Sequence, residues 1–394
     1  LNKLGFSTAD SMKIYHFYKD KINEVIDGYL YNKNYDIDEI PFARVDAIFT
    51  SQYAKDAMYR VASSIIYIMR TLSQTYGHTY FLEEEINSYL YRVLKVEVSQ
   101  EAIDEAYYSL LNDGLVVIRD ERLYLSEMYE AETLIASRLR MLAHEEKISY
   151  KNLDEKIKEI ETHYGIVYTD EQLEAIRLAL TSKVAIITGG PGTGKTTILK
   201  GILDLYKILI ASNKLRLEEQ IALLAPTGRA SKRMSEVTGV EASTIHRFLR
   251  WNKEANRFQI NEYNKSSVSF VIIDEASMID TQLLANLLKG LSASCHIVFV
   301  GDANQLPSVA AGDVLNDMIE SKEIPVYALK NWHRQGTDSA IIPFAHKINE
   351  GILDEGLLNS KEDLEFISCD DGDIIKKIEK ICKNYNSAEL QVLA

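Results

Sequence analysis

The sequence predicts an α/β fold with a parallel sheet in its second half, preceded by mainly helical domains. Short, continuous apolar runs alternate with helical segments from Lys183 onward, and runs of this kind are typical of strands buried on both faces of a parallel sheet. The runs are residues 184–187, 221–224, 270–273 and 297–300. Each is followed at once by a polar motif, and such sheets bind ligands beyond the carboxyl ends of their strands. We therefore expect the four motifs to build one binding site.

The first 147 residues predict two helical domains. Residues 1–72 contain short helical patterns separated by polar turns. In residues 73–147, helices at 83–94 and 100–112 lead into two short apolar strands, 115–118 and 123–125, around a charged turn. A long helix, 128–146, follows. Helices that lead into such a hairpin indicate a winged-helix-like module.

The overall charge and the local charge point in different directions. The 394 residues carry a net charge of -14 and a pI near 5.2, which taken alone disfavours a nucleic-acid partner. Residues 228–253, however, hold six basic side chains against two acidic ones. A protein that moves along DNA needs such a local basic track, although a solvated helix face is the alternative interpretation.

Several classes of protein are disfavoured by composition. The three cysteines, Cys295, Cys369 and Cys382, form no pair motif, which argues against a disulfide scaffold or a zinc site. The longest apolar runs are far too short to span a bilayer, and the first 20 residues do not resemble a signal peptide. We expect a cytoplasmic protein with no membrane segment.

The motif after the first strand is a complete phosphate-binding loop, GGPGTGKTT from Gly189 to Thr197. It follows a strand and opens a helix, which is the context that the motif requires. The residues expected to bind the nucleotide here are Gly190, Pro191, Gly192, Thr193, Gly194, Lys195, Thr196 and Thr197. Lys195 is expected to reach the β- and γ-phosphates, and Thr196 to ligate Mg²⁺. A plain glycine-rich turn is the alternative.

The next two motifs supply catalytic groups. Asp274, directly after the third strand, is the expected second ligand of Mg²⁺, and Glu275 is expected to take a proton from the attacking water. In GDANQLP after the fourth strand, Gln305 could orient the γ-phosphate or the water. The alternatives are a helix cap for the acidic pair and a simple turn for GDANQLP. No Asn-Lys-x-Asp motif follows the acidic pair, so ATP is expected rather than a guanine nucleotide.

Two further residues have a structural and a functional interpretation. Gln172 stands three residues after Thr169, which is the spacing of a helix capping box, and it could also contact the adenine edge. Arg334 follows the sheet region and could serve as an arginine finger on the γ-phosphate. The alternative is an ordinary surface residue.

Taken together, residues 169–350 resemble the RecD-like helicases of superfamily one. The ordered set that carries the resemblance is Gln172, GGPGTGKTT, LAPTGRAS (224–231), STIHRFL (243–249), VIIDEASMID (271–280), GDANQLPSVAAGD (301–313) and WHRQG (332–336). Upstream, GHTYF (77–81), LVVIRDERLYL (115–125) and residues 130–142 resemble the front of the longer, stand-alone RecD-like enzymes. The family's helix-hairpin-helix corresponds to residues 1–72, although residues 40–45 lack its glycine.

The resemblance implies a P-loop NTPase with a RecA-like sheet at residues 148–330 and the start of a second such domain, incomplete, at 331–394. It implies that Pro226, Thr227, Arg229, Thr244 and His246 line a track for single-stranded DNA. Residues 250–264 would be a hairpin insertion with aromatic side chains, acting either as a pin that parts the duplex or as a plain connector. The apolar residues 390–394 would be a strand just begun.

The implied function is an ATP-dependent DNA helicase that moves 5′ to 3′ on single-stranded DNA and opens duplex junctions in repair and recombination. Its cofactors would be ATP and Mg²⁺, while the sequence predicts no particular protein partner. The alternatives are a non-translocating, DNA-dependent P-loop ATPase and a DNA-binding module with a vestigial ATPase. The intact Lys195, Asp274 and Glu275 argue against the last.

Overall fold

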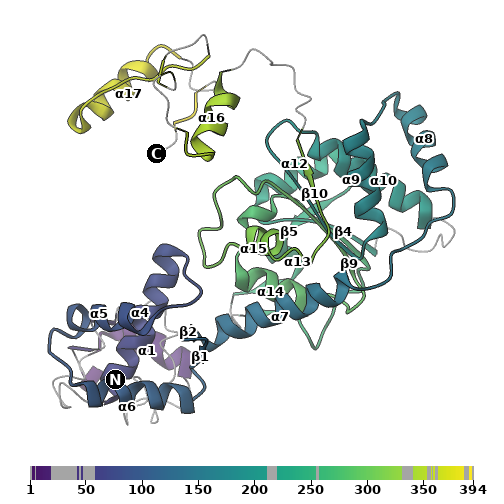
Figure 1. The fold of residues 1–394 in the computed structure, drawn as a ribbon. Coiled ribbons are helices and arrows are strands. Elements are labelled where there is room, and N and C mark those ends of the chain that lie inside the picture. The colour runs from purple at the N-terminus through teal and green to yellow at the C-terminus, as the bar shows by residue number, and fades with distance from the viewer. Residues whose placement is uncertain are drawn as a thin grey trace. The chain divides into compact units, whose positions relative to one another are not determined.

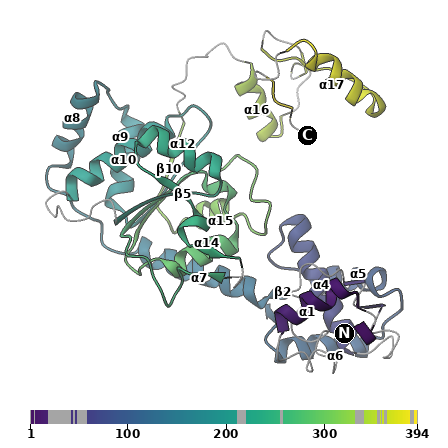
Figure 2. The ribbon, with the colours of Figure 1, turned by 180° about the vertical axis from the view of Figure 1, so that it is seen from behind.

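The computed structural model describes residues 2–4, 6–18, 42–43, 46–47, 58–210, 220–253, 257–330, 340–352, 356, 358–359, 363–385 and 390–392. They fall into two compact units, residues 1–333 and 334–394. Figures 1 and 2 show the elements of each unit from opposite sides. Among the helices so described, none is both long enough and apolar enough to cross a membrane.

The front of the chain forms a helical module that ends in a hairpin. Its elements are η1 (Asn2–Leu4), α1 (Thr8–Tyr18), α4 (Met58–Tyr76), α5 (Glu83–Leu94), α6 (Gln100–Asn112), β1 (Val116–Arg119) and β2 (Arg122–Leu125). The bounds of α5 and α6 match the predicted ones, and the two strands pair antiparallel around the charged turn. Phe81 pairs with Leu123 of the hairpin and is fully buried between it and the helices. This order of helices and hairpin is the one the sequence predicts for a winged-helix-like module.

The second half of unit 1 contains one parallel sheet of six strands. The strands are β3 (Val184–Gly189), β4 (Ile221–Ala225), β5 (Ala242–Thr244), β8 (Phe270–Ile273), β9 (His296–Gly301) and β10 (Val326–Leu329). Their order is β10-β3-β9-β8-β4-β5, and every neighbouring pair is parallel. The predicted α/β fold is confirmed, and β5 and β10 extend the sheet beyond the four predicted strands at its two edges.

Helices cover both faces of the sheet (Figures 1 and 2). One face packs against α8 (Leu153–Tyr164), α9 (Asp170–Thr181), α10 (Lys195–Ile210) and α12 (Gly228–Thr238). The other packs against α7 (Ser126–Ala143), α14 (Thr281–Gly290) and α15 (Val314–Glu320). Side chains of β9 alternate between the two layers: Phe299 enters the second, while Val298 and Val300 enter the first. This alternation explains why each central strand is apolar throughout.

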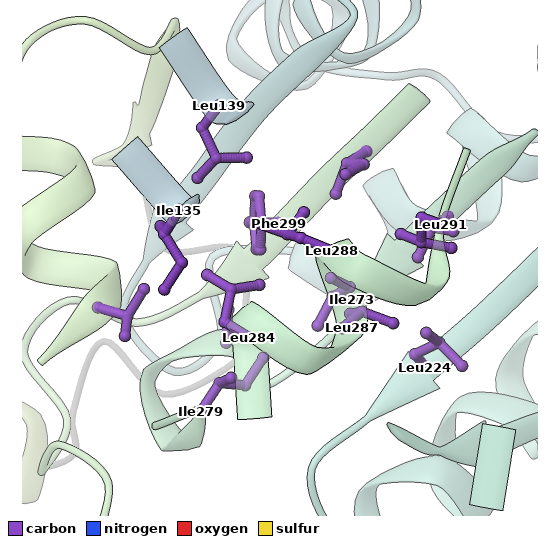
Figure 3. Packing of buried hydrophobic residues seen from close by; sticks show 14 of the residues in the cluster. Ile135, Leu139, Leu224, Ile273, Ile279, Leu284, Leu287, Leu288, Leu291 and Phe299 are labelled. Carbon is purple, nitrogen blue, oxygen red and sulfur yellow. The ribbon is translucent and has the colours of Figure 1, made fainter. Parts of the chain in front are cut away.

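Helix α7 joins the helical module to the sheet domain. In Figure 3, its Ile135 and Leu139 face Phe299 of the sheet, next to Leu284 and Leu288 of α14. All five side chains are buried. Burying an aliphatic side chain of this size contributes about 1.5–3 kcal/mol, so α7 is held firmly against the sheet domain.

Short elements connect the strands and carry polar residues. They are α13 (Ile245–Phe248), the hairpin strands β6 (Trp251–Asn252) and β7 (Arg257–Phe258), and η4 (Ala276–Met278). Unit 2 contains α16 (Ile341–Asn349), η5 (Asp371–Asp373) and α17 (Ile374–Cys382). The predicted strand at 390–394 is wrong for residues 390–392, which are described and form no strand. An extended apolar segment becomes a strand only where a neighbouring strand takes its hydrogen bonds, and the described residues of unit 2 contain no strand.

Candidate nucleotide site and adjoining track

The phosphate-binding loop runs from the end of β3 to the start of α10 and depends on its glycines. Gly192 and Gly194 have φ of +84° and +87°, a region that favours glycine. Thr193 Oγ1 donates to the Gly190 carbonyl at 2.9 Å. A Cβ on Gly189 would lie 2.8 Å from Thr193 Oγ1 and 2.9 Å from Leu329 Cβ, so β10 and the loop leave no room for a side chain there. The loop is therefore preformed around its backbone amides.

Lys195 lies over this loop. Its Nζ donates to the carbonyl oxygens of Gly189, at 2.5 Å, and Gly190, at 2.9 Å. Burial lowers the pKa of its ammonium, and the carboxylates of Asp302, Glu275 and Asp274 oppose that shift. An ammonium so placed can transfer its hydrogen bonds from two carbonyls to phosphate oxygens.

The acidic pair stands at the end of β8. Glu275 has φ of +54°, and its amide donates to Asp274 Oδ1 at 3.0 Å. Burial raises the pKa of both carboxyl groups, and the charge of Asp274 raises that of Glu275 further. Partly desolvated, mutually repelling carboxylates suit a cation, and a raised pKa suits a group that must accept a proton.

The donor set fits Mg²⁺ bound together with a nucleotide. Among the described residues, no group of three or more His, Cys, Asp or Glu side chains is placed to hold a metal ion. Mg²⁺ commonly takes one or two protein oxygens and completes its shell with phosphate oxygens and water. The Thr196 hydroxyl and the Asp274 carboxylate would be those protein ligands.

The motif after β9 brings one further carboxylate to the site. Asp302 is buried, and it is the carboxylate that acts most strongly on the pKa of Lys195. Ala303 donates its amide to Thr188 Oγ1 of β3 at 3.1 Å, which fixes the start of this loop beside the phosphate-binding loop. The predicted Gln305 is exposed. Sequence reasoning gave no role to Asp302, although its position directly after a strand was a usable signal.

Arg233 on α12 is a second residue that sequence reasoning did not assign. Its charge acts on the pKa values of Lys195, Asp274 and Glu275, opposing the rise for the two acids. It follows Arg229 by four positions, so both lie along one side of the helix. The signal for it was present, because Arg233 belongs to the basic segment 228–253.

Of the two residues Gln172 and Arg334, the structure describes only Gln172. Gln172 is buried and forms the predicted capping box: its Oε1 accepts from the Thr169 amide at 3.1 Å, and Thr169 Oγ1 accepts from the Gln172 amide at 3.4 Å. Its contact with adenine stays a prediction. Arg334 lies outside the described residues.

The five predicted track residues gather where β4 and β5 end. Pro226 and Thr227 follow β4 directly, and the register pairs Ala225 with Thr244, which ends β5. The hydroxyls of Thr227 and Thr244 each accept a helix-capping hydrogen bond at 3.2 Å, from Ala230 and Arg247 respectively. Arg229 and His246 are exposed. Both hydroxyls can still donate a proton to a phosphate oxygen.

A hairpin adjoins this track. The ring of His246 lies 5.7 Å from that of Phe258, which meets Trp251 edge-on at 4.7 Å. The base of the hairpin is anchored to α14, because Ser266 donates to the Gly290 carbonyl at 2.8 Å and Ile260 packs against Gly290. Tyr263 is 92% exposed. The insertion is thus a hairpin whose base is packed against α14 and whose aromatic side chains lie beside the track.

Comparison with known proteins agrees with this geometry. The model of the AAA domain family matches residues 167–371, which is just over half of the chain. The model of the helix-hairpin-helix domain of the ATP-dependent RecD2 DNA helicase matches residues 1–80. This chain belongs to the AAA domain family, as a RecD-like member.

Curated relatives of the RecD-like kind cover much of the chain. It is 28% identical over 329 residues to the ATP-dependent RecD2 DNA helicase of Deinococcus radiodurans, covering 80% of this chain and 44% of that protein. It is 34% identical over 225 residues to the RecBCD enzyme subunit RecD of Mycobacterium tuberculosis, covering 51% and 38%. The RecD-like chain therefore spans less than half the length of these relatives.

Solved structures add a distant likeness. The Pif1 helicase of Candida albicans covers 56% of this chain and 56% of its own, with 21% identity and a TM-score of 0.39. The assignment to the family rests on the sequence matches and not on this likeness.

Proposed function

We propose that this RecD-like protein is an ATP-dependent DNA helicase that couples hydrolysis to 5′-to-3′ movement on single-stranded DNA and opens duplex junctions. The observation that supports it most is the juxtaposition of two sites at one edge of the sheet. The phosphate-binding loop and acidic pair follow β3 and β8, while the track follows β4 and β5. Helix α12 links them, because Thr227 and Arg229 lie at its start and Arg233 acts on the acids.

Each residue of the two sites has its own role in the proposed mechanism. Lys195 holds the β- and γ-phosphates, while Thr196 and Asp274 hold Mg²⁺, which neutralises phosphate charge when bound. Glu275 accepts the proton of the attacking water, and Gln305 orients that water or the γ-phosphate. Arg334, from the second domain, stabilises the charge that develops on the γ-phosphate, and Gln172 contacts adenine. The DNA backbone is held by Pro226, Thr227, Arg229, Thr244 and His246. A conformational change at the nucleotide site therefore moves the DNA.

The test is ATP turnover by the whole protein with and without single-stranded DNA, combined with strand separation on a forked duplex. We expect DNA to stimulate hydrolysis and unwinding to require ATP. Lys195→Ala should lower turnover about 10²-fold or more, because one preorganised phosphate contact is lost. Lys200→Ala, on the same helix but over the ring of Tyr164 at 4.2 Å, is the matched control and should leave turnover unchanged.

Each alternative function has its own outcome. Hydrolysis that DNA stimulates, with no movement or unwinding, would favour the non-translocating ATPase. DNA binding without hydrolysis would favour the vestigial site. We expect a helicase of this kind to act in repair and recombination in the cytoplasm.

A further inference from the structure

The loop that follows β9 connects the nucleotide site to the helical module. It begins at Asp302, which is buried beside Lys195, and continues to Asp313 before α15. Ala311, near its far end, is 8% exposed and belongs to the same buried cluster as Phe81 and Leu123 of the helical module. One short loop thus runs from the nucleotide site to the hydrophobic core of the helical module.

Backbone hydrogen bonds hold residues 311 and 312 between the end of α4 and the start of α14. Gly312 donates its amide to the Gly77 carbonyl, directly after α4, at 3.1 Å. Thr281, the first residue of α14, donates to the Ala311 carbonyl at 3.1 Å. Gly312 has φ of +102°, and a Cβ there would lie 2.0 Å from Thr281 Oγ1. The joint therefore requires glycine for both its backbone conformation and its space.

The middle of the loop has no such support. Among the hydrogen bonds that the structure shows for residues 304–310, all are made to neighbours within the loop. Gln305 is exposed, and Val309 is 93% exposed. The position of Gln305 consequently depends on the anchors at the two ends, since fixing both ends of a short segment restricts its conformations.

We propose that Ala311 and Gly312 are positioning residues for ATP hydrolysis, through which the helical module holds Gln305 in place at the nucleotide site. The proposal rests on the function proposed above for Gln305. It gives GHTYF (77–81) a role, because Gly77 takes the Gly312 hydrogen bond and Phe81 lies in the core that receives Ala311. It also makes the helical module a part of the ATPase rather than an appendage, so a ligand that displaces the module should change turnover.

The test compares two neighbouring substitutions in the whole protein. Ala311→Asp places a carboxylate in the apolar core of the module and should break the joint, because burying an unpaired charge is costly. Ala310→Asp adds the same charge one position earlier, at an exposed residue, and is the matched control. We expect Ala311→Asp to lower the DNA-stimulated kcat about tenfold or more, since small misplacements of catalytic groups cost this much. The KM for ATP should stay within about twofold, and Ala311→Ser, nearly isosteric, should retain the wild-type kcat.

A second readout needs no turnover. Hydrogen exchange of the Ala311→Asp chain should show lost protection at residues 302–312, while β3, β8 and β9 stay protected and one ADP still binds per chain. Should Ala311→Asp reduce the binding stoichiometry, the neutral Ala311→Asn is judged by the same criteria.

The outcomes separate the two proposals. An unchanged kcat together with unchanged loop protection in both variants would overturn the positioning role. A wild-type protein that hydrolyses no ATP would instead overturn the proposed function, while hydrogen exchange would still decide whether the module holds the loop.

Discussion

Glu275 is the residue on which the chemical step depends in the proposed mechanism. Glu275→Gln keeps the size of the side chain and removes the proton acceptor, so nucleotide affinity should persist while hydrolysis falls about 10²–10⁴-fold. Titration calorimetry with ADP and a turnover assay measure the two quantities. Glu236→Gln, exposed on α12, is the control. Should hydrolysis of bound ATP persist in Glu275→Gln, the water is activated by another group.

His296 controls a pH dependence that is unrelated to catalysis. The ring is buried against Phe270, Nε2 lies 2.7 Å from the Ala179 carbonyl, and burial lowers its pKa to about 4. Between that value and an ordinary pKa of about 6.5, the unfolded chain binds the proton and the folded chain does not. Stability should therefore fall as pH drops through this window, by up to about 3 kcal/mol in total.

Urea unfolding at several pH values between about 4 and 6.5 measures this effect. His296→Gln should flatten the dependence, because it removes the titrating group. His163→Gln, at an exposed position, should leave the dependence as it is in the wild type. An equal slope in all three proteins would show that His296 does not titrate as inferred.

At the scale of elements, the aromatic hairpin has the clearest expected role. Its base is packed against α14, so residues 253–256 can be replaced by two glycines without removing Phe258 or Ile260. We expect DNA-stimulated hydrolysis to persist and strand separation to be lost. The control changes the turn of the other hairpin, Asp120–Glu121, to Asn-Gly. Normal unwinding after the first change would show that the hairpin is a connector.

The track makes a separate prediction about salt. Arg229 is exposed at the start of α12, where its guanidinium can contact a phosphate. Arg229→Ala should weaken binding to single-stranded DNA and flatten the slope of log affinity against log salt by about 0.7, the value of one phosphate contact on a single strand. Fluorescence anisotropy across a salt series measures this, with the exposed Lys151→Ala as control. An unchanged slope in Arg229→Ala would contradict the proposed track.

Elements with strong local patterns could be predicted, and those that depend on distant partners could not. The four central strands are continuous apolar runs, and the capping-box spacing of Thr169 and Gln172 predicted the start of α9. Strands β5 and β10 are short and partly exposed at the sheet edges, so their pattern is weak. Arg233 acts on the pKa values of Asp274 and Glu275, and Asp302 acts on that of Glu275, across a long separation in sequence. The hydrogen bond from Gly312 to Gly77 also joins residues far apart in sequence. The roles of Gln172 and Gln305 toward a nucleotide stay predictions.

At the scale of the whole molecule, unwinding in the proposed mechanism requires two RecA-like domains, so residues 1–394 alone should bind nucleotide without unwinding DNA. By resemblance, these helicases hold ATP between two RecA-like domains, and the described residues contain one six-stranded sheet and, after residue 333, helices without a strand. The comparison is with a chain extended through a complete second motor domain. Equal unwinding rates for both chains would contradict the two-domain mechanism. They would also contradict the assignment of residues 331–394 to the start of a second RecA-like domain.

The strand order of the sheet also bears on how the protein is made. Strand β3 pairs on one side with β9 and on the other with β10, whose Val326 lies about 140 positions after its partner Ile186. At a synthesis rate of about 5–20 residues per second, Ile186, just before the phosphate-binding loop, is translated some 7–28 seconds before its partner Val326. The loop thus cannot close against Leu329 until nearly the whole domain is present. Chains ending at residue 325 should bind ADP far more weakly than chains ending at residue 330, and equal affinity would show that β10 is dispensable for the site.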